Sequence, residues 1–207
     1  MEPCPMRSGV SYADVCRYRA EAPEGFLGFP AVCGRDQLMA SYLTAASRIL
    51  EIGAGERPFR NVLEQFNGIY KTMDVDPDQQ QDYHSIDDIV EIFDAIIMRE
   101  VVEHLSRDLC FQYLRKIHRL LSPGGVLVLS TPNPFSPWMW CDYTHISHWP
   151  PRDMHGILRA HGFEKVEIFR IIWPSRWLWL KKIYWYGHSR FFKIDYAGSY
   201  VAVGRKP

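Results

Sequence analysis

Glu51-Ile-Gly-Ala-Gly55 is the stretch that decides the fold of this 207-residue chain. It overlaps the end of a short apolar run, Arg48 to Ile52, that is typical of a buried strand. Gly53 and Gly55 permit a tight turn and let a ligand approach the backbone closely. A helix after the turn would direct free N–H groups at a carboxylate. The stretch therefore predicts a strand, a glycine turn and a helix, with a ligand at the turn.

Outward from this turn, apolar strands alternate with amphipathic helices. This alternation predicts an α/β fold, a doubly wound and mainly parallel Rossmann-like sheet with helices on both faces. In such a sheet the ligand lies beyond the carboxyl ends of the strands. The expected strands are 48–52, 69–75, 93–98, 126–130, 165–170 and 199–204, and the expected helices are 12–19, 35–46, 58–66, 108–121 and 151–161, with weak helical character at 86–90.

The composition is that of an ordinary globular protein. Net charge is zero and charged residues make up 23%, which gives no reason to expect a nucleic-acid partner. The cysteines are odd in number and form no C-x-x-C pair, so neither a disulfide framework nor a structural zinc site is expected. We expect reduced thiols, a cytoplasmic location, no signal peptide and no transmembrane segment. The cysteines are Cys4, Cys16, Cys33, Cys110 and Cys141.

An acidic residue follows the second strand of this series. Asp74 lies 19 residues beyond Gly55 and can accept hydrogen bonds from both hydroxyls of a ribose. A dinucleotide site would carry a third glycine where this chain has Pro58. The glycine turn together with Asp74 favours an adenosine-containing ligand and weakens the interpretation as a nicotinamide-dependent enzyme. For the glycine turn alone, an ordinary strand-to-helix connection remains an alternative.

Five segments in unbroken order carry a resemblance to a known family: EIGAG, MDVDP, DYHSI, FDAIIMREVVEHL and LSPGGVLVLSTPN. Over roughly residues 47 to 170 the chain resembles a class I S-adenosylmethionine-dependent methyltransferase. These motifs are similar to those of the subgroup that includes the ubiquinone-biosynthesis O-methyltransferases. The resemblance implies S-adenosylmethionine as methyl donor and S-adenosylhomocysteine as product. It also implies a seven-stranded, mostly parallel sheet whose last strand is antiparallel.

The resemblance also implies which residues hold the cofactor. Glu51, Gly53 and Gly55 would contact the methionine part of the cofactor, and Asp74 would contact the ribose. Asp82 and Tyr83 would contact the adenine. Arg99 and Glu100 would lie next to the reacting centre. Asp87 or Asp88 remains an alternative to Asp82, because the loop length varies here. Glu51 has a second interpretation as a cap of its loop. His104 is common at its position in this subgroup, and a purely structural role for it is equally open.

A stiff, proline-rich loop and a polar segment follow the fifth strand. The segment 138–149 resembles a D-x-T-H stretch that lies where acceptors bind in this family, so we expect it to contact the acceptor. Tyr12, in an N-terminal segment of the kind that often covers the pocket, is expected to contribute as well. The expected acceptor contacts are Trp138, Asp142, Tyr143 and Tyr12.

A hydroxyl acceptor has to lose a proton, and a neutral histidine is suited to accept it. His145 is the first candidate base and His148 the second. A hydrogen bond that orders the loop is the alternative role for His145. No metal cluster of the catechol-methylating type is visible in the sequence, so we expect no metal.

We divide the chain into an N-terminal helical cover of the active site, 1–46, and a methyl-transfer domain, 47–207, with an aromatic insertion at 171–195. Three interpretations of the insertion remain open. It is a lid over an apolar acceptor, a peripheral membrane contact through 173–192, or the contact of a homodimer. Its aromatic residues include Trp173, Trp177, Trp179, Tyr184, Trp185 and Tyr186, beside Lys181 and Lys182.

The sequence therefore predicts methyl transfer from S-adenosylmethionine to a small organic acceptor, at oxygen, in biosynthetic metabolism. Transfer to nitrogen or carbon is one alternative. A methyltransferase-like protein that binds the cofactor without catalysis is another. A nicotinamide-dependent oxidoreductase is a third, which Pro58 disfavours.

Overall fold

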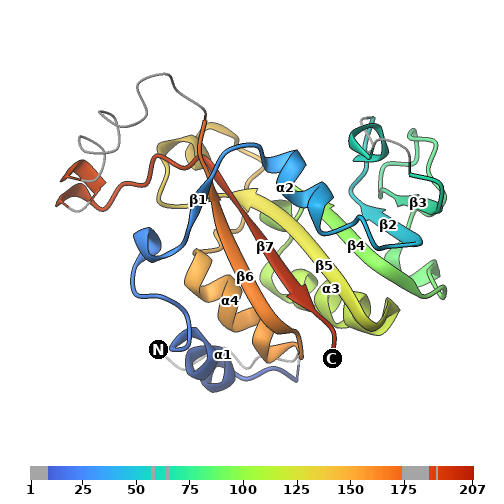
Figure 1. Ribbon diagram of the computed structural model, residues 1–207, viewed down its shortest axis with the longest axis horizontal. Helices are drawn as coiled ribbons and strands as arrows, with labels where there is room; N and C mark the ends of the chain where they lie inside the picture. The colour runs from blue at the N-terminus through green and yellow to red at the C-terminus, as the bar shows by residue number, and fades with distance from the viewer. Residues whose placement is uncertain (1–8, 57–58, 64–65, 174–186, 190) are drawn as a thin grey trace.

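One seven-stranded sheet runs through the centre of the computed structural model, with strand order β1-β6-β7-β5-β4-β2-β3 (Figure 1). The structure describes residues 9–56, 59–63, 66–173, 187–189 and 191–207. Neighbouring strands are parallel except where β7 runs antiparallel to β5 and β6. The predicted seven-stranded, mostly parallel sheet with an antiparallel last strand is confirmed. The strands are β1 (Ala31–Val32), β2 (Arg48–Ile52), β3 (Ile69–Met73), β4 (Phe93–Arg99), β5 (Leu121–Pro132), β6 (Glu164–Ile171) and β7 (Ser199–Arg205).

Helices cover both faces of this sheet, as predicted. Alternate residues of each strand point to opposite faces. Leu50 of β2 packs in the same core as Leu114 of α3, whereas its neighbour Ile49 packs in a second core with Met39 of α2. Burial on both faces explains why these strands are nearly continuous apolar runs. The α-helices are α1 (Tyr12–Arg19), α2 (Arg35–Ser41), α3 (Arg107–Leu120) and α4 (Pro151–Ala160).

Short 3-10 helices occupy several of the connections. One of them corrects a prediction, because the helix expected over 58–66 is a 3-10 helix at Phe59–Val62. Residues 57–58 and 64–65 lie outside the described part of the chain. The Glu51 carboxylate accepts the Phe59 N–H at 2.7 Å, so a buried side chain takes up a donor at the start of this segment. The 3-10 helices are η1 (Phe26–Gly28), η2 (Phe59–Val62), η3 (Ile86–Asp88), η4 (Val102–His104) and η5 (Pro137–Cys141).

The N-terminal segment is built into the fold. It contributes β1, which the sequence analysis did not predict and which pairs in parallel with Arg170 and Ile171 of β6. α1 packs on α4, where Arg19 forms an ion pair with Asp153 at 2.8 Å. A Cβ atom on Gly156 of α4 would lie 2.5 Å from the carbonyl oxygen of Val15, so only glycine permits this close approach. The segment therefore completes the sheet and also covers α4.

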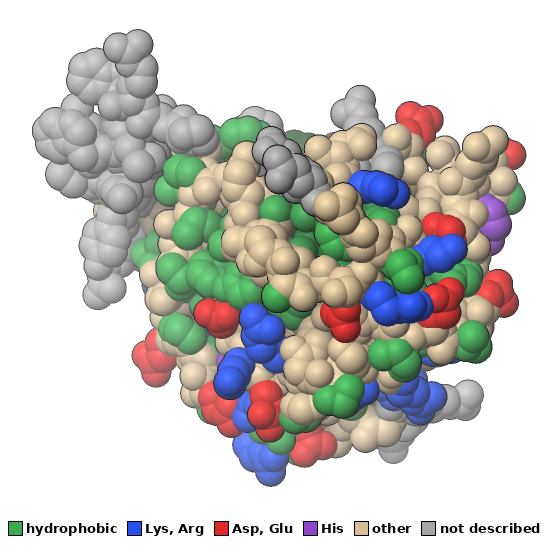
Figure 2. All heavy atoms as spheres, turned by 45° about the vertical axis from the view of Figure 1, so that its right-hand side comes forward, with side chains coloured by type: hydrophobic (Ala, Val, Ile, Leu, Met, Phe, Trp, Pro, Cys, Tyr) green, Lys and Arg blue, Asp and Glu red, His purple; other side chains and the backbone are tan. Residues whose placement is uncertain are grey.

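Three further observations concern the cysteines, the lack of a long apolar helix among the described residues, and the surface charge. Cys16, Cys33, Cys110 and Cys141 are free thiols, and Cys4 lies outside the described residues. Across the described residues, no helix combines the length and the apolar character that a bilayer crossing requires. On the face turned forward in Figure 2, basic and acidic side chains are interspersed rather than gathered by sign.

The aromatic insertion falls largely outside the described residues, since 174–186 and 190 belong to the part left out. At its borders Trp173 is 82% exposed and Phe191 is 80% exposed. Its roles as a lid, a membrane contact or a dimer contact stay predictions.

Candidate functional site

The glycine turn after β2 has the backbone geometry that the sequence predicts. Gly53 and Gly55 have φ of 74° and 52°, in the left-handed region that favours glycine. A Cβ atom on Gly53 would lie 2.3 Å from Cγ2 of Val101, so the turn packs closely on the segment after β4. A Cβ atom on Gly55 would meet no atom of the described residues within 4 Å. The space on the Cβ side of Gly55 is therefore open to a neighbouring molecule, whereas its N–H and its carbonyl are bonded to Asp74 and Gln81.

Asp74 lies directly beside this turn. Its Oδ2 atom accepts the N–H of Gly55 at 2.9 Å, and its Oδ1 atom accepts the N–H of Asp76 at 3.1 Å. The N–H of Gly53 donates to the carbonyl of Met73, at the end of β3, at 2.8 Å. The structure thus brings together the glycines and the acidic residue that the sequence spacing related. The contact of Asp74 with a ribose stays a prediction.

Glu51 is fully buried at the end of β2 and is held by three donors. It accepts hydrogen bonds from the Phe59 N–H at 2.7 Å, the Tyr70 hydroxyl at 2.7 Å and Arg99 Nε at 3.2 Å. Burial raises the pKa of the Glu51 carboxyl, against the hydrogen bonds from Tyr70 and Phe59 that lower it. Both carboxylate oxygens are engaged by the protein. This favours the interpretation in which Glu51, together with Arg99, orders the loops at the ends of β2 and β4.

Asp82 and Tyr83 lie beside β3, where both side chains bind protein groups. Asp82 accepts the Thr72 N–H and the Lys71 ammonium, each at 2.8 Å. Tyr83 forms a parallel bridge with Met73 and donates its hydroxyl to Glu91. Their predicted contacts with adenine remain untested.

His84 is a neighbour of Asp74 that the sequence analysis missed. Its Nδ1 atom lies 3.1 Å from the backbone oxygen of Asp74. The signal was present, since His84 belongs to the DYHSI segment.

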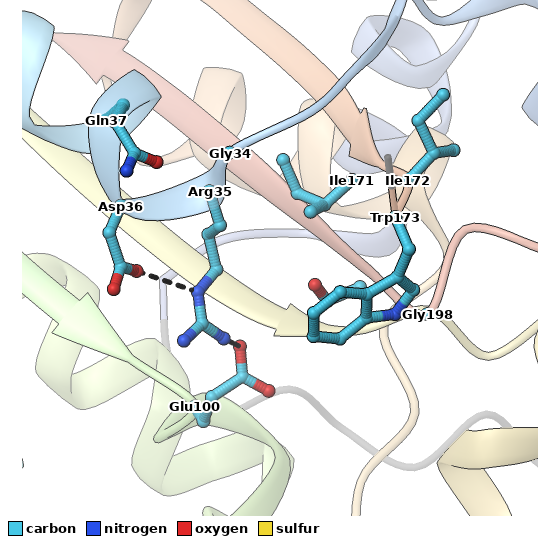
Figure 3. A pocket seen from close by; sticks show the side chains of 10 residues that line it. Gly34, Arg35, Asp36, Gln37, Glu100, Ile171, Ile172, Trp173 and Gly198 are labelled. Atoms are coloured by element: carbon cyan, nitrogen blue, oxygen red, sulfur yellow. Dashed lines mark hydrogen bonds and ion pairs between the residues drawn. The ribbon is translucent and has the colours of Figure 1, made fainter. Parts of the chain in front are cut away.

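A cavity of about 680 Å³ opens beyond the carboxyl ends of β4 and β6 (Figure 3). Its volume is in the range of small-molecule sites, and its position is the one expected for ligands of a doubly wound sheet. Glu100 is the one predicted cofactor residue among those that line it. The lining residues are Gly34, Arg35, Asp36, Gln37, Glu100, Ile171, Ile172, Trp173, Gly198 and Ser199.

Arg35 lies between two carboxylates in this cavity, across from the ring of Trp173 (Figure 3). It donates to Glu100 at 3.0 Å and to Asp36 at 3.1 Å, and Glu100 also accepts the Ser130 hydroxyl at 2.7 Å. Glu100 has φ of 51°, a strained conformation for a residue other than glycine. Arg35 could not be predicted from the sequence, because 65 residues separate it from Glu100.

Next to Glu100 lies a cluster of Glu103, His104 and His145, in which one ligand atom from each residue lies within 4.8 Å of the others. Glu103 is fully buried, and its Oε2 atom accepts the Thr131 hydroxyl at 3.0 Å. Burial, with the negative charge of Glu100, raises the pKa of Glu103 to about 8. His145 was predicted from the sequence as a base and His104 was left open, whereas no role was predicted for Glu103. The glutamate was visible as the residue before His104 in REVVEHL.

The other predicted acceptor residues lie along the same segment but are more exposed. Asp142 accepts the Thr144 N–H at 2.9 Å, and its Oδ2 atom lies 3.8 Å from Nε2 of His145. His148 is exposed, with its ring 4.4 Å from that of Trp140. Tyr143 is 96% exposed. The side chain of Trp138 lies outside what the structure describes.

The N-terminal segment lines both cavities of the described structure that lie near this edge. Gly34 to Gln37 belong to the first cavity, and Phe26 belongs to a second of about 620 Å³ beside the start of α4. Phe26 also stacks on Phe135, at 4.9 Å between ring centres. Tyr12 is 71% exposed and lines neither cavity. Its predicted contact with the acceptor, like those of Trp138, Asp142 and Tyr143, stays a prediction.

Comparison with known sequences identifies the family of the chain. A family model described as a methyltransferase domain matches residues 30–168. A curated relative, the ubiquinone biosynthesis O-methyltransferase of Ruegeria pomeroyi, is 34% identical over a match of 105 residues that covers 43% of this chain. The match spans 42% of that relative's length, less than half of it.

Solved structures share the fold at low sequence identity. An S-adenosylmethionine-dependent methyltransferase from Archaeoglobus fulgidus superposes with a TM-score of 0.68 at 18% identity, over 84% of this chain and 95% of that chain. The N-methyltransferase NodS from Bradyrhizobium japonicum gives 0.58 at 19% identity, over 84% and 94%. Phosphoethanolamine N-methyltransferase 2 of Haemonchus contortus, solved with S-adenosylmethionine, gives 0.58 at 14% identity, over 100% and 61%. At these identities the likeness establishes the fold.

Proposed function

Because this chain belongs to the class I S-adenosylmethionine-dependent methyltransferases, we propose that it methylates an oxygen atom of a small organic acceptor in a biosynthetic pathway. The observation that carries the proposal is the cavity of about 680 Å³ at the carboxyl edge of the sheet, lined in part by Glu100. Its volume suits a small molecule. Oxygen is favoured over nitrogen or carbon by the O-methyltransferase relative that is 34% identical over 105 residues.

The residues at the glycine turn fit S-adenosylmethionine. Among the described residues nothing fills the space on the Cβ side of Gly55, and the carboxylate of Asp74 adjoins it. We place the methionine part along Gly53 and Gly55 and the ribose hydroxyls at Asp74, where a carboxylate can accept from both of them. Glu51 orders this turn through its bond to Phe59 rather than by touching the cofactor. When bound, the cofactor supplies an electrophilic methyl group attached to a sulfonium. The sulfur leaves as a neutral thioether, so the leaving group needs no acid.

The chain's own task is to align the acceptor and to manage one proton. Ile171, Ile172 and Trp173 give the cavity an apolar wall for the body of the acceptor. Holding two reacting groups in line is worth several kcal/mol, up to about 7–11 kcal/mol in favourable cases.

Of the two candidate histidines, His145 is the better placed to act at the acceptor hydroxyl. Its Nδ1 atom lies 3.1 Å from the carbonyl of Met139, so Nδ1 carries the hydrogen and Nε2 keeps a lone pair. His148 instead lies exposed against Trp140.

The proposal is tested in two steps with the full chain. Calorimetric titration should show binding of S-adenosylmethionine and S-adenosylhomocysteine. Incubation with trideuteriomethyl S-adenosylmethionine and matched panels of phenols, amines and carbon acids should then label phenols, as read by mass spectrometry. Labelling of amines or carbon atoms alone would replace the proposal by the N- or C-methylation alternative. Binding without transfer to any panel would favour a non-catalytic role, and no binding by a folded sample would refute cofactor dependence.

A further inference from the structure

Two neighbouring side chains of η4, Glu103 and His104, lie close to His145 of the segment after η5. We propose that Glu103, His104 and His145 bind a divalent first-row transition-metal ion, such as Mn²⁺ or Zn²⁺. The three residues each offer one ligand atom, and these atoms all lie within 4.8 Å of one another. Metal–ligand bonds of about 2.1 Å place neighbouring ligand atoms roughly 3.4 Å apart. A small rotation, above all of the exposed His104, closes the set around an ion.

The hydrogen bonds of the two imidazoles leave the nitrogens that a metal requires. His104 Nδ1 lies 3.2 Å from the Thr144 carbonyl, and His145 Nδ1 lies 3.1 Å from the Met139 carbonyl. A carbonyl can only accept, so Nδ1 carries the hydrogen in both rings and Nε2 holds the lone pair. A backbone carbonyl that fixes the second ring nitrogen in this way is the usual outer contact of a metal-bound histidine.

Glu103 gives an independent observation that points to a ligand. The side chain is fully buried, and its Oε1 atom has no hydrogen-bond partner among the residues that the structure describes. Leaving a buried polar atom unpaired costs about 1–3 kcal/mol, and more when the group is charged. A second carboxylate, Glu100, adds negative charge nearby and interacts with Glu103 electrostatically. A cation would satisfy Oε1 and offset both charges.

The segments that carry the three ligands are fixed to one another before any ion binds. The backbone oxygen of Glu103 accepts the N–H groups of Ile146 and Ser147, at 2.9 and 3.0 Å. The Ser147 hydroxyl donates to the carbonyl of Leu105 at 2.6 Å, and the Trp149 indole N–H donates to the carbonyl of Val102 at 2.9 Å. Four hydrogen bonds therefore hold the segment that carries His145 against η4. Ligand residues on segments fixed in this way favour binding of an ion, because little conformational entropy remains to be lost when the ion binds.

The donor set selects the class of ion. Two imidazoles with one carboxylate suit Mn²⁺, Fe²⁺, Co²⁺ or Zn²⁺, whereas Mg²⁺ and Ca²⁺ prefer sites made of oxygen atoms. Three protein ligands also leave positions open on the metal, as in catalytic sites. An acceptor oxygen bound there would be oriented and would lose its proton more readily. With the ion bound, Nε2 of His145 is a ligand, so solvent rather than His145 would take that proton. That role rests on the proposed function, whereas the binding of the ion does not.

The test is a calorimetric titration of MnCl₂ or ZnCl₂ into the full, untagged and chelator-treated chain, in the absence of S-adenosylmethionine. One ion should bind per chain. His145→Ala and Glu103→Gln should each lower the affinity at least tenfold, in line with the loss of one ligand. His148→Ala is the matched control, because it removes an exposed histidine from the same segment, and it should bind as tightly as the unaltered chain. Thermal unfolding without metal checks that each variant is folded.

A second measurement does not depend on the variants. With Co²⁺ in place of Mn²⁺ or Zn²⁺, the chain should show visible absorption bands that the His145→Ala chain lacks. Absence of saturable binding would overturn the proposal, as would binding that both ligand variants leave unchanged. A chain that binds the ion but transfers no methyl group would refute the proposed function and leave the metal site standing.

Discussion

Asp74 is the residue on which recognition of the cofactor should depend most directly. Its carboxylate already accepts the Gly55 N–H at the edge of the open turn. Hydrogen bonds to a charged group contribute about 1.5–3 kcal/mol, so Asp74→Asn should weaken S-adenosylmethionine binding about ten- to a hundredfold. Calorimetric titration measures this. Asp76→Asn, two residues further on in the exposed turn, should leave the affinity within a factor of about two.

Glu51 should act on stability rather than on ligand contact. It is fully buried and holds Phe59, Tyr70 and Arg99. Removing one partner of a buried charged network costs on the order of 3 kcal/mol, because the remaining groups lose their compensation. Glu51→Ala should therefore lower the free energy of unfolding by that amount in urea titrations. If Glu51→Ala proves no more destabilising than Glu56→Ala, at an exposed position of the same loop, the ordering role assigned to Glu51 is wrong.

Residues related by spacing along one motif could be predicted, and residues related only by folding could not. Gly53, Gly55 and Asp74 meet as predicted, because each follows a neighbouring parallel strand. Arg35 and Glu100 meet across 65 residues, and no local pattern relates them. The two donors from Ile146 and Ser147 to the backbone of Glu103 are equally invisible in the sequence, although they decide where His145 lies.

Among the elements, α4 and its C-terminal cap carry a pH-dependent part of the stability. Burial lowers the pKa of His161, and likewise the pKa of His155 and of His118 on α3. His161 Nδ1 lies 2.7 Å from the Ile157 carbonyl, and its buried Nε2 has no partner among the described residues. Protonation would therefore place an unpaired charged donor beside Phe111, whose ring lies 4.9 Å away.

The lowered pKa values of these histidines determine how the stability changes with pH. Above the unfolded-state pKa of about 6.5 the histidines are neutral in both states, and their contribution is complete. As the pH falls below it, the unfolded chain binds protons that the folded chain resists, so stability is lost. Urea titrations between pH 7 and pH 5 should show this loss, with a smaller slope in His161→Gln. The exposed His84→Gln should keep the slope of the unaltered chain, and equal slopes in all three would contradict the assignment.

Elements long enough to show a regular spacing of apolar residues were predicted from the sequence. Elements that form only because of tertiary contacts were not. α3 and α4 show apolar residues at helical spacing, and each lies within one residue of its predicted bounds. β1 is two residues long, too short to show any alternation, and exists because the edge of β6 is there to pair with. η2 replaces a predicted helix, because Glu51 and Arg99 bind Phe59 from elsewhere in the chain.

For the whole molecule, the division into a cover, 1–46, and a domain, 47–207, has a consequence that the fold makes testable. Met39 and Leu43 of the first part are fully buried in the core on one face of the sheet. β1 pairs with β6, and α1 packs on α4. A chain of residues 47–207 would expose that core and the edge of β6. Each large apolar side chain removed from a core costs about 2–5 kcal/mol, and the whole stability of a domain is about 5–15 kcal/mol.

We therefore expect residues 47–207 alone to lack a cooperative thermal transition and to be cleaved rapidly by protease, whereas the full chain should melt cooperatively. The graded variant is Gly156→Ala, whose new Cβ would lie 2.5 Å from the carbonyl oxygen of Val15 and would push α1 off α4. It should lower the melting temperature while leaving the transition cooperative, since β1 and α2 stay in place. If residues 47–207 melt cooperatively near the temperature of the full chain, the N-terminal segment is a removable cover and the sheet does not depend on it.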